Sequence, residues 1–301
     1  MGSVAKGALL KRFRVSKNSI IFKKVVFTLI NDIKTIEKLQ QIKLFVLDID
    51  GTFYVSQKLV NGALKFSSLL KKQNKKLVFL TNNSNKSKKE YLQEFDALNY
   101  PIKENEIYTA GITAAEYIKD KFGAKRIFLV ATPSMIQEYE RLGHSIVTDS
   151  PEMVVVTFDK SLTYDKLAKA SIFVSKGAFF FVTNPDLNCP TEEGPIPDSA
   201  AIASVVSRAC NKEPDVIFGK PDPKILEMIM KDYQVTPEKT CIVGDRLYTD
   251  ILIGINAGAL STLVLTGEAK LEDLKDSAIK PDLVVNDLGQ LADLIMGGES
   301  G

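Results

Sequence analysis

Residues 43–52 read Lys-Leu-Phe-Val-Leu-Asp-Ile-Asp-Gly-Thr. The apolar run Leu44–Leu47 has the length and composition of a strand that is buried on both faces of a sheet. Side chains two positions apart in an extended chain point the same way, so Asp48 and Asp50 face one side. Gly51 then lets the chain turn away. The stretch predicts a buried strand with two carboxylates at its carboxyl end, although alone it also fits an ordinary Asp-Gly turn.

Further short apolar runs follow along the chain, and amphipathic stretches separate them. The runs lie at 77–80, 127–131, 153–158, 178–182, 216–218, 241–243, 262–265 and 283–285. The helical patterns lie at 87–98, 113–122, 199–209 and 223–233, and Ser87 with Glu90 forms a capping box at the start of the first. Most runs are continuous rather than alternating, as in parallel sheets that are covered on both faces. The pattern predicts a doubly wound, Rossmann-like α/β fold.

Polar clusters follow many of the predicted strands. They are Asp48–Thr52, Thr81–Ser84, Thr183–Asp186, Gly219–Asp222 and Gly244–Arg246. Ligands of open α/β sheets bind beyond the carboxyl ends of the strands, so clusters far apart in the sequence can converge. Taken alone, each cluster also fits a polar turn or a helix cap. Together they predict one polar site, where Thr81, Asn82 and Asn83 suit a phosphate or carboxylate oxygen and flanking prolines hold Lys220.

Composition narrows the chemistry of that site. The chain has 301 residues and a formal net charge of +2, so no charge excess points to nucleic acid or an anionic membrane as a partner. The single histidine, His144, excludes a three-His zinc site and disfavours a Ser-His-Asp triad; we expect it on a surface turn without a catalytic role. The three cysteines form no CxxC motif, which favours small apolar roles and a reducing, cytoplasmic location.

The N-terminal segment differs from the rest of the chain. Residues 1–31 hold seven lysines and arginines and no acidic residue. Their longest apolar run, 25–30, is too short for a signal-peptide core or a membrane span. A basic, acid-poor stretch can be a transit peptide, an upstream start or a solvated arm. We expect residues 1–41 to be an extension outside the fold.

The motifs together resemble the haloacid dehalogenase superfamily, and within it the NagD-like and 4-nitrophenylphosphatase branch, over residues 42–296. The matching motifs are Asp48-x-Asp50-Gly51-Thr52, Thr81-Asn82-Asn83, Gly219-Lys220-Pro221, Gly244-Asp245-x-x-x-Thr249-Asp250 and Thr183-Asn184-Pro185-Asp186. The gap between the second and third motifs is far longer than one crossover needs. We therefore expect a catalytic core at 42–121 and 213–297 and an inserted domain at 122–212, which the resemblance identifies as an α/β cap of the C2 type over the cleft.

The resemblance implies a phosphatase that hydrolyses small phosphomonoesters through an aspartyl-phosphate intermediate. Asp48 would attack phosphorus, and Asp50 would protonate the leaving oxygen and then take a proton from the attacking water. Thr81, Asn82, Asn83 and Lys220 would bind the phosphoryl oxygens. The segment 184–197 resembles a rigid loop on the inner side of the cap, so Asn184, Asp186 and Asn188 are candidates for leaving-group contacts.

Charge counting points independently to a metal. The acidic side chains of the predicted site outnumber the basic ones: they are Asp48, Asp50, Asp245 and Asp250 against Lys220 and Arg246. This excess would repel a phosphate dianion unless a cation intervened, and hard oxygen ligands select Mg²⁺. The resemblance assigns the Asp48 carboxylate, the Asp50 carbonyl and the Asp245 carboxylate to the ion. Asp250 would act through water or by holding a direct ligand.

Two other functions use the same kinds of strand-end groups. A receiver-like phospho-acceptor switch would lack the second aspartate and the large insertion. A phosphosugar-binding or mutase relative would carry a small helical cap between the first two motifs, where residues 52–76 hold only a loop and one helix. For the phosphatase we expect a small phosphorylated metabolite as substrate, no nucleic-acid or membrane partner, and a possible homodimer.

Overall fold

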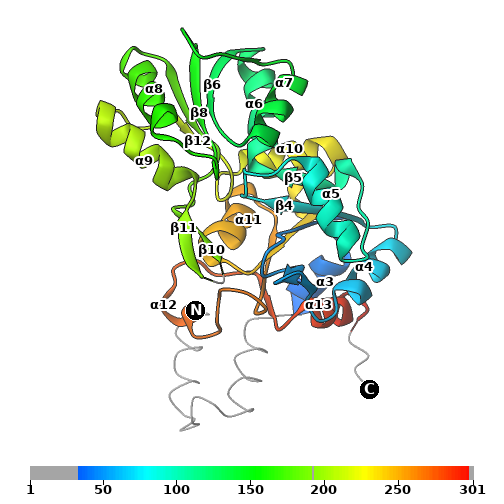
Figure 1. The fold of residues 1–301 in the computed structure, drawn as a ribbon. Helices are drawn as coiled ribbons and strands as arrows, with labels where there is room; N and C mark the ends of the chain where they lie inside the picture. The colour runs from blue at the N-terminus through cyan, green and yellow to red at the C-terminus, as the bar shows by residue number, and fades with distance from the viewer. Residues whose placement is uncertain (1–32, 192, 298–301) are drawn as a thin grey trace.

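A computed structural model describes residues 33–191 and 193–297, which build two parallel sheets flanked by helices (Figure 1). The larger sheet has the strand order β15-β14-β13-β1-β4-β5. Its strands are β1 (Leu44–Leu47), β4 (Lys76–Thr81), β5 (Ile107–Thr109), β13 (Thr240–Gly244), β14 (Leu260–Val264) and β15 (Leu283–Val285). Every neighbouring pair in it is parallel, which confirms the predicted sheet type.

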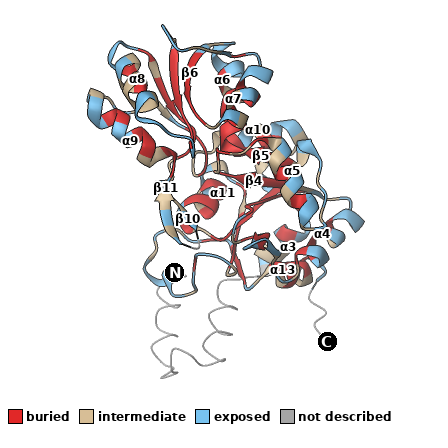
Figure 2. Cartoon of the chain, in the orientation of Figure 1, coloured by how far each residue is buried: buried red, intermediate tan, exposed pale blue. Residues whose placement is uncertain are grey.

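Helices pack on both faces of this sheet. On one face lie α3 (Ile33–Gln40), α4 (Ala63–Lys72), α5 (Lys88–Ala97) and α13 (Leu288–Ile295), and on the other α6 (Ala110–Phe122), α10 (Lys224–Tyr233) and α11 (Leu252–Ala257). In β1, Phe45 and Leu47 pack in the hydrophobic core on the α3 side of the sheet, whereas Leu44 and Val46 pack in the core on the α6 side. The strands are therefore buried on both sides, as Figure 2 shows, and the doubly wound fold is confirmed.

The predicted N-terminal extension overlaps the folded core. Residues 1–32 lie outside the described residues, but α3 covers most of 33–41 and packs on α13. Leu39 is fully buried in the same cluster as Leu291, so α3 is part of the core that begins, in the structure, before residue 42. This helix was not predicted from the sequence, because its amphipathic pattern is short and directly follows the basic segment 1–31.

The smaller sheet has the strand order β12-β9-β8-β6-β7, again with parallel pairs. Its strands are β6 (Arg126–Val130), β7 (Ser145–Ile146), β8 (Met153–Val156), β9 (Phe179–Val182) and β12 (Val216–Ile217). Around it lie α7 (Pro133–Arg141), α8 (Tyr164–Ser175) and α9 (Ser199–Cys210). Because β12 pairs with β9, this sheet extends past residue 212, the point at which we expected the chain to re-enter the core.

Two hairpins and several short elements complete the fold. The hairpins pair β2 (Tyr54–Val55) with β3 (Lys58–Leu59), and β10 (Asn188–Thr191) with β11 (Gly194–Pro197). Both strands of the second hairpin fall in the segment that we expected to be a loop. Each contains proline, which cannot donate a ladder hydrogen bond, so the sequence pattern did not indicate strands. The short helices are η1 (Glu104–Glu106), η2 (Pro237–Lys239) and α12 (Asp273–Asp276).

His144 is buried rather than exposed on a surface turn. Its Nδ1 accepts a hydrogen bond from the Lys125 amide at 3.2 Å, and its Nε2 lies 3.0 Å from the Ala115 carbonyl oxygen. The turn after α7 folds the ring back onto α6, where it satisfies two backbone groups. This placement leaves it away from the strand ends of the larger sheet.

None of the helices within 33–191 and 193–297 combines the length and apolar character needed to cross a membrane.

The strand order places a crevice beside β1. From β1 the chain proceeds to β4 and β5 on one side, and β13, β14 and β15 lie on the other. Such a reversal leaves an open crevice beyond the carboxyl ends of the central strands. The polar clusters that begin at Asp48, Thr81 and Gly244 lie at the carboxyl ends of β1, β4 and β13. The topology therefore brings these three clusters together.

Candidate active site

Three aspartates converge at the carboxyl ends of β1 and β13. Asp48 follows β1, Asp245 follows β13, and Asp250 lies in η3 (Leu247–Ile251), a turn of π-helix that begins two residues later. One carboxylate oxygen of each lies within 4.8 Å of the other two. All three side chains are buried. The structure therefore brings Asp48 together with two carboxylates that lie about 200 residues later in the sequence.

Two glycines make room for Asp245. Gly51 has a φ of +87°, and a Cβ there would lie 2.4 Å from Asp245 Oδ2. A Cβ on Gly267 would lie 2.0 Å from the same oxygen. Both distances are far shorter than any real contact, so a side chain at either position would displace the carboxylate. The Asp-Gly pair of the first motif thus serves the site as well as the turn.

Lys220 supplies the opposing charge. Its Nζ donates to Asp48 Oδ1 and, at 2.6 Å, to Asp250 Oδ1, and the residue is 2% exposed. Burial alone would lower the pKa of Lys220, but the two carboxylates outweigh burial and raise it, so the side chain stays an ammonium. The single positive charge of Lys220 lies between the two negative charges of Asp48 and Asp250, so it neutralises them only in part.

The remaining carboxylate oxygens fit a cation. Asp250 Oδ2 accepts the Arg246 amide at 3.1 Å, so both oxygens of Asp250 have protein partners. Asp245 Oδ2 accepts the Glu268 amide at 2.7 Å, whereas Asp245 Oδ1 is buried without any hydrogen-bond partner. Burial, and then Asp250, raise the pKa of Asp245 to about 6. An orphaned oxygen among three carboxylates is the donor set that a hard divalent cation such as Mg²⁺ takes.

Asn82 holds Lys220 in place. Its Oδ1 accepts the Lys220 amide at 2.8 Å, and its Nδ2 donates to the Lys220 carbonyl at 2.9 Å and to Asp186 Oδ2 at 3.1 Å. The side chain that we expected to bind phosphate is thus occupied by the backbone of Lys220. Neighbouring side chains cap their own loop: Thr81 Oγ1 accepts the Asn83 amide at 3.1 Å, and Asn83 Oδ1 accepts the Asn85 amide at 3.0 Å.

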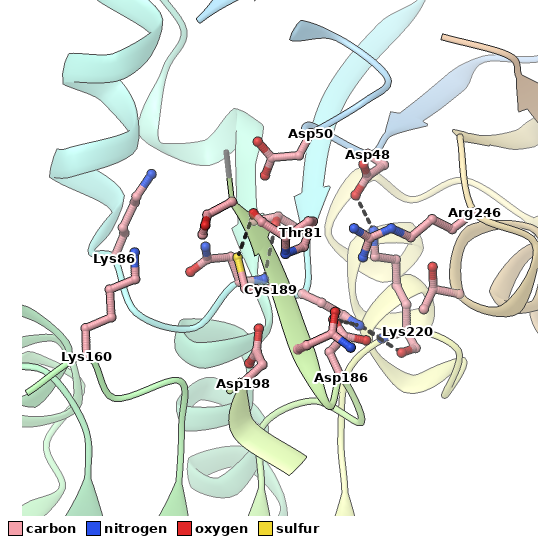
Figure 3. A pocket seen from close by; sticks show the side chains of 16 residues that line it. Asp48, Asp50, Thr81, Lys86, Lys160, Asp186, Cys189, Asp198, Lys220 and Arg246 are labelled. Carbon is pink, nitrogen blue, oxygen red and sulfur yellow. Dashed lines mark hydrogen bonds and ion pairs between the residues drawn. The ribbon is translucent and has the colours of Figure 1, made fainter. Parts of the chain in front are cut away.

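A cavity of about 270 Å³ opens between these groups and the β10–β11 hairpin (Figure 3). Eight residues singled out from the sequence line it: Asp48, Asp50, Thr81, Asn82, Asn83, Asp186, Asn188 and Lys220. Asp50 projects into the cavity on the same wall as Asp48. Although its side chain is exposed to the cavity, the protein around it desolvates the carboxylate and raises the pKa of Asp50, which Lys86 partly offsets. Asp50 can therefore hold a proton more readily than a free aspartate.

Asn184 does not line this cavity. It is fully buried, and its Nδ2 donates to the Asn82 carbonyl at 2.7 Å and to Ser199 Oγ at 2.9 Å. Its Oδ1 accepts the Asp186 amide at 3.0 Å. The predicted leaving-group contact is therefore wrong for Asn184: the side chain ties the strand ends of the two sheets together. Asp186 and Asn188, the other two candidates, do face the cavity.

Eight lining residues were given no catalytic or binding role from the sequence, although Arg246 was counted among the basic groups of the predicted site. They are Lys86, Lys160, Cys189, Pro190, Thr191, Asp198, Arg246 and Thr249. Arg246 and Thr249 belong to the fourth motif, so their position in it was the available signal. Lys86 lies five residues beyond Thr81, within reach of the same strand end. Lys160 and Asp198 come from the smaller sheet, and no local pattern marks them.

Comparisons with known proteins agree with this geometry. The family model described as haloacid dehalogenase-like hydrolase matches residues 45–145, and one described as HAD-hydrolase-like matches residues 217–291. The acid sugar phosphatase of Staphylococcus haemolyticus is 32% identical over 245 residues, which are 81% of this chain and 93% of that protein. The 5′-nucleotidase YutF of Bacillus subtilis is 31% identical over 244 residues, or 81% and 95%.

Solved structures show the same likeness. The 4-nitrophenylphosphatase of Thermotoga maritima superposes with a TM-score of 0.83 at 43% identity, covering 85% of this chain and 98% of that one. NagD of E. coli K-12 superposes with a TM-score of 0.77 at 28% identity, covering 83% and 98%. The resemblance noted from the motifs is therefore confirmed. The two matches cover 85% and 83% of this chain, which is more than the larger sheet and its helices occupy, so the likeness includes the smaller sheet.

Proposed function

The chain belongs to the haloacid dehalogenase-like hydrolase family and is a phosphatase of small phosphomonoesters, and we propose that Asp48 is its nucleophile. The observation that carries the assignment is the placement of Asp48: it ends the central strand β1, lines the cavity and contacts Lys220. A carboxylate oxygen can attack phosphorus and form an aspartyl-phosphate, which splits one difficult displacement into two steps. Lys220 orients the carboxylate for that attack.

Asp50 acts as the general acid and base. Its raised pKa lets it carry a proton into the first step, in which the P–O bond to the leaving group breaks and the departing oxygen takes that proton. In the second step the ionised Asp50 accepts a proton from the water that attacks the phosphoaspartate. Inorganic phosphate leaves, and Asp48 and the protonated Asp50 are restored. Because Asp50 faces the same cavity as Asp48, both steps proceed without a rearrangement of the chain.

The carboxylate cluster would hold Mg²⁺. The orphaned Asp245 Oδ1 and the Asp48 carboxylate are the direct ligands that we assign, together with the Asp50 carbonyl, while Asp250 holds Lys220 and the Arg246 amide. The ion would supply positive charge against the phosphoryl oxygens beside the three clustered carboxylates. Lys220 adds a fixed charge that stabilises the same oxygens as negative charge develops on them.

We assign the smaller sheet to a cap, in the span 122–217, that covers the catalytic cleft. Its hairpin β10–β11 reaches the cavity, which Asn188 and Cys189 line together with residues at the strand ends of the larger sheet. Asp186 and Asn188 are then the leaving-group contacts. Relatives named for sugar phosphates, nucleotides and 4-nitrophenyl phosphate make these three classes the first candidates for substrates. A homodimer and a cytoplasmic location stay predictions from the sequence.

The receiver-like and mutase alternatives fit the site less well. A receiver keeps its phosphoaspartate long enough to signal, whereas Asp50 beside Asp48 favours its rapid hydrolysis. A mutase-type helical cap would lie between β1 and β4, where the structure has the hairpin β2–β3 and α4. The insertion lies instead between β4 and the Lys220 motif, so hydrolysis is the function that the arrangement favours.

Phosphate release from a panel of phosphomonoesters, with and without Mg²⁺, tests the proposal. We expect Mg²⁺-dependent turnover that Asp48→Asn abolishes, since the amide is not a nucleophile. Asp165→Asn is the matched control, because the Asp165 side chain is 71% exposed on α8 and pairs with the neighbouring Lys169. Full turnover by Asp48→Asn, or turnover that is indifferent to a chelator, would contradict the proposal.

A further inference from the structure

Four basic side chains line the cavity, and three of them have carboxylate partners. Lys220 pairs with Asp48 and Asp250, Lys86 with Glu94, and Arg246 with Glu268. Lys160 differs, because its Nζ is within ion-pair distance of no carboxylate among the residues that the structure describes. Its Nζ lies over the ring of Phe158, 5.3 Å from the ring centroid. The cavity thus contains one cation without a counter-charge.

The loop that carries Lys160 is anchored on both sides. Before it, the Phe158 amide donates to Ser84 Oγ at 2.9 Å, which joins the loop to the segment after β4. The next residue, Asp159, has a fully buried side chain that pairs with Lys166 at 2.6 Å. Polar groups around Lys160 are therefore used to fix the backbone. The unpaired ammonium is presented by a rigid segment, which is how a binding group is held for a ligand.

Two of the aspartates that line the cavity already have hydrogen-bond partners. Asp198 caps α9 by accepting the Ser199 amide, and Asp186 accepts a hydrogen bond from Asn82. Figure 3 places Lys160 and Lys86 together on the wall of the cavity that lies away from Asp48 and Arg246. Lys86 already has Glu94 as its partner, whereas Lys160 is exposed and has no carboxylate partner among the described residues. Lys160 is thus the cation on this wall that an anionic group in the cavity can pair with.

We propose that Lys160, assisted by Lys86, binds a second anionic group on the leaving-group side of the substrate. The inference rests on the proposed function, because it takes the phosphoryl group to lie at Asp48. The preferred substrates are then phosphomonoesters whose leaving group carries a carboxylate or another phosphate. A neutral sugar or a nitrophenyl group would leave Lys160 unpaired. Charged hydrogen bonds of this kind contribute more to binding than neutral ones, so they discriminate between such substrates.

Matched substrate pairs test the proposal with the full chain and saturating Mg²⁺. In the carboxylate arm, 3-phosphoglycerate is compared with glycerol 3-phosphate; in the phosphate arm, fructose 1,6-bisphosphate is compared with fructose 6-phosphate. The readout is the ratio of kcat/KM between the charged and the neutral member of each pair. The variants are Lys160→Gln, Lys160→Arg and Lys86→Gln. Lys176→Gln, an exposed lysine at the end of α8, is the control.

We expect the wild-type ratio to favour the charged member in at least one arm, and Lys160→Gln to lower that ratio by roughly tenfold or more. Lys160→Arg should restore most of it, Lys86→Gln should lower it less, and Lys176→Gln should leave it unchanged. The arm that responds identifies the anion as carboxylate or phosphate. A wild-type preference for the neutral members, or an equal ratio in Lys160→Gln, overturns the inference. Failure of Asp48→Asn to abolish turnover would instead overturn the proposed function.

Discussion

Lys220 Nζ lies 2.6 Å from Asp250 Oδ1, and both side chains are almost completely excluded from water. The pair is the structural link between the loop after β12 and the π-helical turn after β13. Since the same ammonium also contacts Asp48, the catalytic strand end depends on a buried ion pair. Breaking such a pair by removing one partner is costly, because the other partner remains buried with an uncompensated charge.

Lys220→Met should therefore destabilise the protein as well as inactivate it. We expect the free energy of unfolding to fall by about 3–5 kcal/mol, measured by urea denaturation without Mg²⁺. Lys224→Met is the control, because Lys224 pairs with Asp222 at 2.6 Å but is 39% exposed, and such pairs contribute less than about 1 kcal/mol. An equal loss of unfolding free energy in the two variants would show that the buried ion pair stabilises the protein no more than the exposed one.

Asp198 should make stability depend on pH. Burial raises the pKa of Asp198 to about 6 from 3.8, although its bond from the Ser199 amide lowers it. The folded state binds this proton more tightly than the unfolded chain, so the stabilisation is complete below about pH 4 and is lost as pH rises through about 6. Asp198→Asn keeps an oxygen for the helix cap and removes the titration.

The variant should therefore be more stable than the wild type at pH 7, by about 1–3 kcal/mol, and the difference should shrink toward pH 4. Chemical denaturation at a series of pH values measures it. Asp276→Asn is the matched comparison for a general charge effect, because Asp276 is exposed at the end of α12. A difference that grows as pH falls would have the opposite sign to the one predicted here.

Asn184 and Asn188 should give opposite phenotypes. Asn184→Ala leaves the Asn82 carbonyl and Ser199 Oγ without their donor in a buried position, so we expect a loss of about 1–3 kcal/mol in unfolding free energy. Asn188 is exposed and lines the cavity, so Asn188→Ala should raise KM with little change in stability. Thermal unfolding and steady-state kinetics on both variants check the contrast, and a large KM change confined to Asn184→Ala would reverse the assignment.

Asp245→Asn should weaken the binding of Mg²⁺, so that turnover needs a higher Mg²⁺ concentration. Its orphaned Oδ1 is the group that most needs a cation, and an amide oxygen offers that cation no charge. We expect the Mg²⁺ concentration for half-maximal activity to rise at least tenfold. Asp282→Asn is a control. Asp282, just before β15, accepts hydrogen bonds from the amide and the hydroxyl of Ser261 in β14, away from the carboxylate cluster. An unchanged Mg²⁺ requirement would remove Asp245 from the ligand set.

Much of the fold could be predicted because local pattern and buried environment agree. The apolar runs 44–47 and 283–285 coincide with β1 and β15, and the capping box is formed, with Glu90 Oε2 accepting the Ser87 amide at 2.7 Å. Elements with weak patterns were missed. Strand β5 has only three residues, and the β10–β11 hairpin contains prolines that normally argue against strands.

The site divides along the same line. Asp48, Asp245 and Lys220 could be placed because each follows a recognisable strand or turn, and the sheet topology makes the strand ends meet. Asn184 and Asn188 lie on one segment, and only tertiary packing decides that the first is buried and the second faces the cavity. Lys160 gives no sequence signal, since its significance lies in having no carboxylate partner among the residues that the structure describes.

Trapping the phosphorylated intermediate tests the central role of Asp48 most directly. In Asp50→Asn, 4-nitrophenyl phosphate can still react, because nitrophenolate leaves without a proton, whereas hydrolysis of the phosphoaspartate lacks its base. We predict a burst of nitrophenolate equal to the enzyme concentration and, by peptide mass spectrometry, one phosphoryl group on Asp48. A phosphoryl group on another residue, or turnover without any covalent intermediate, would contradict the account.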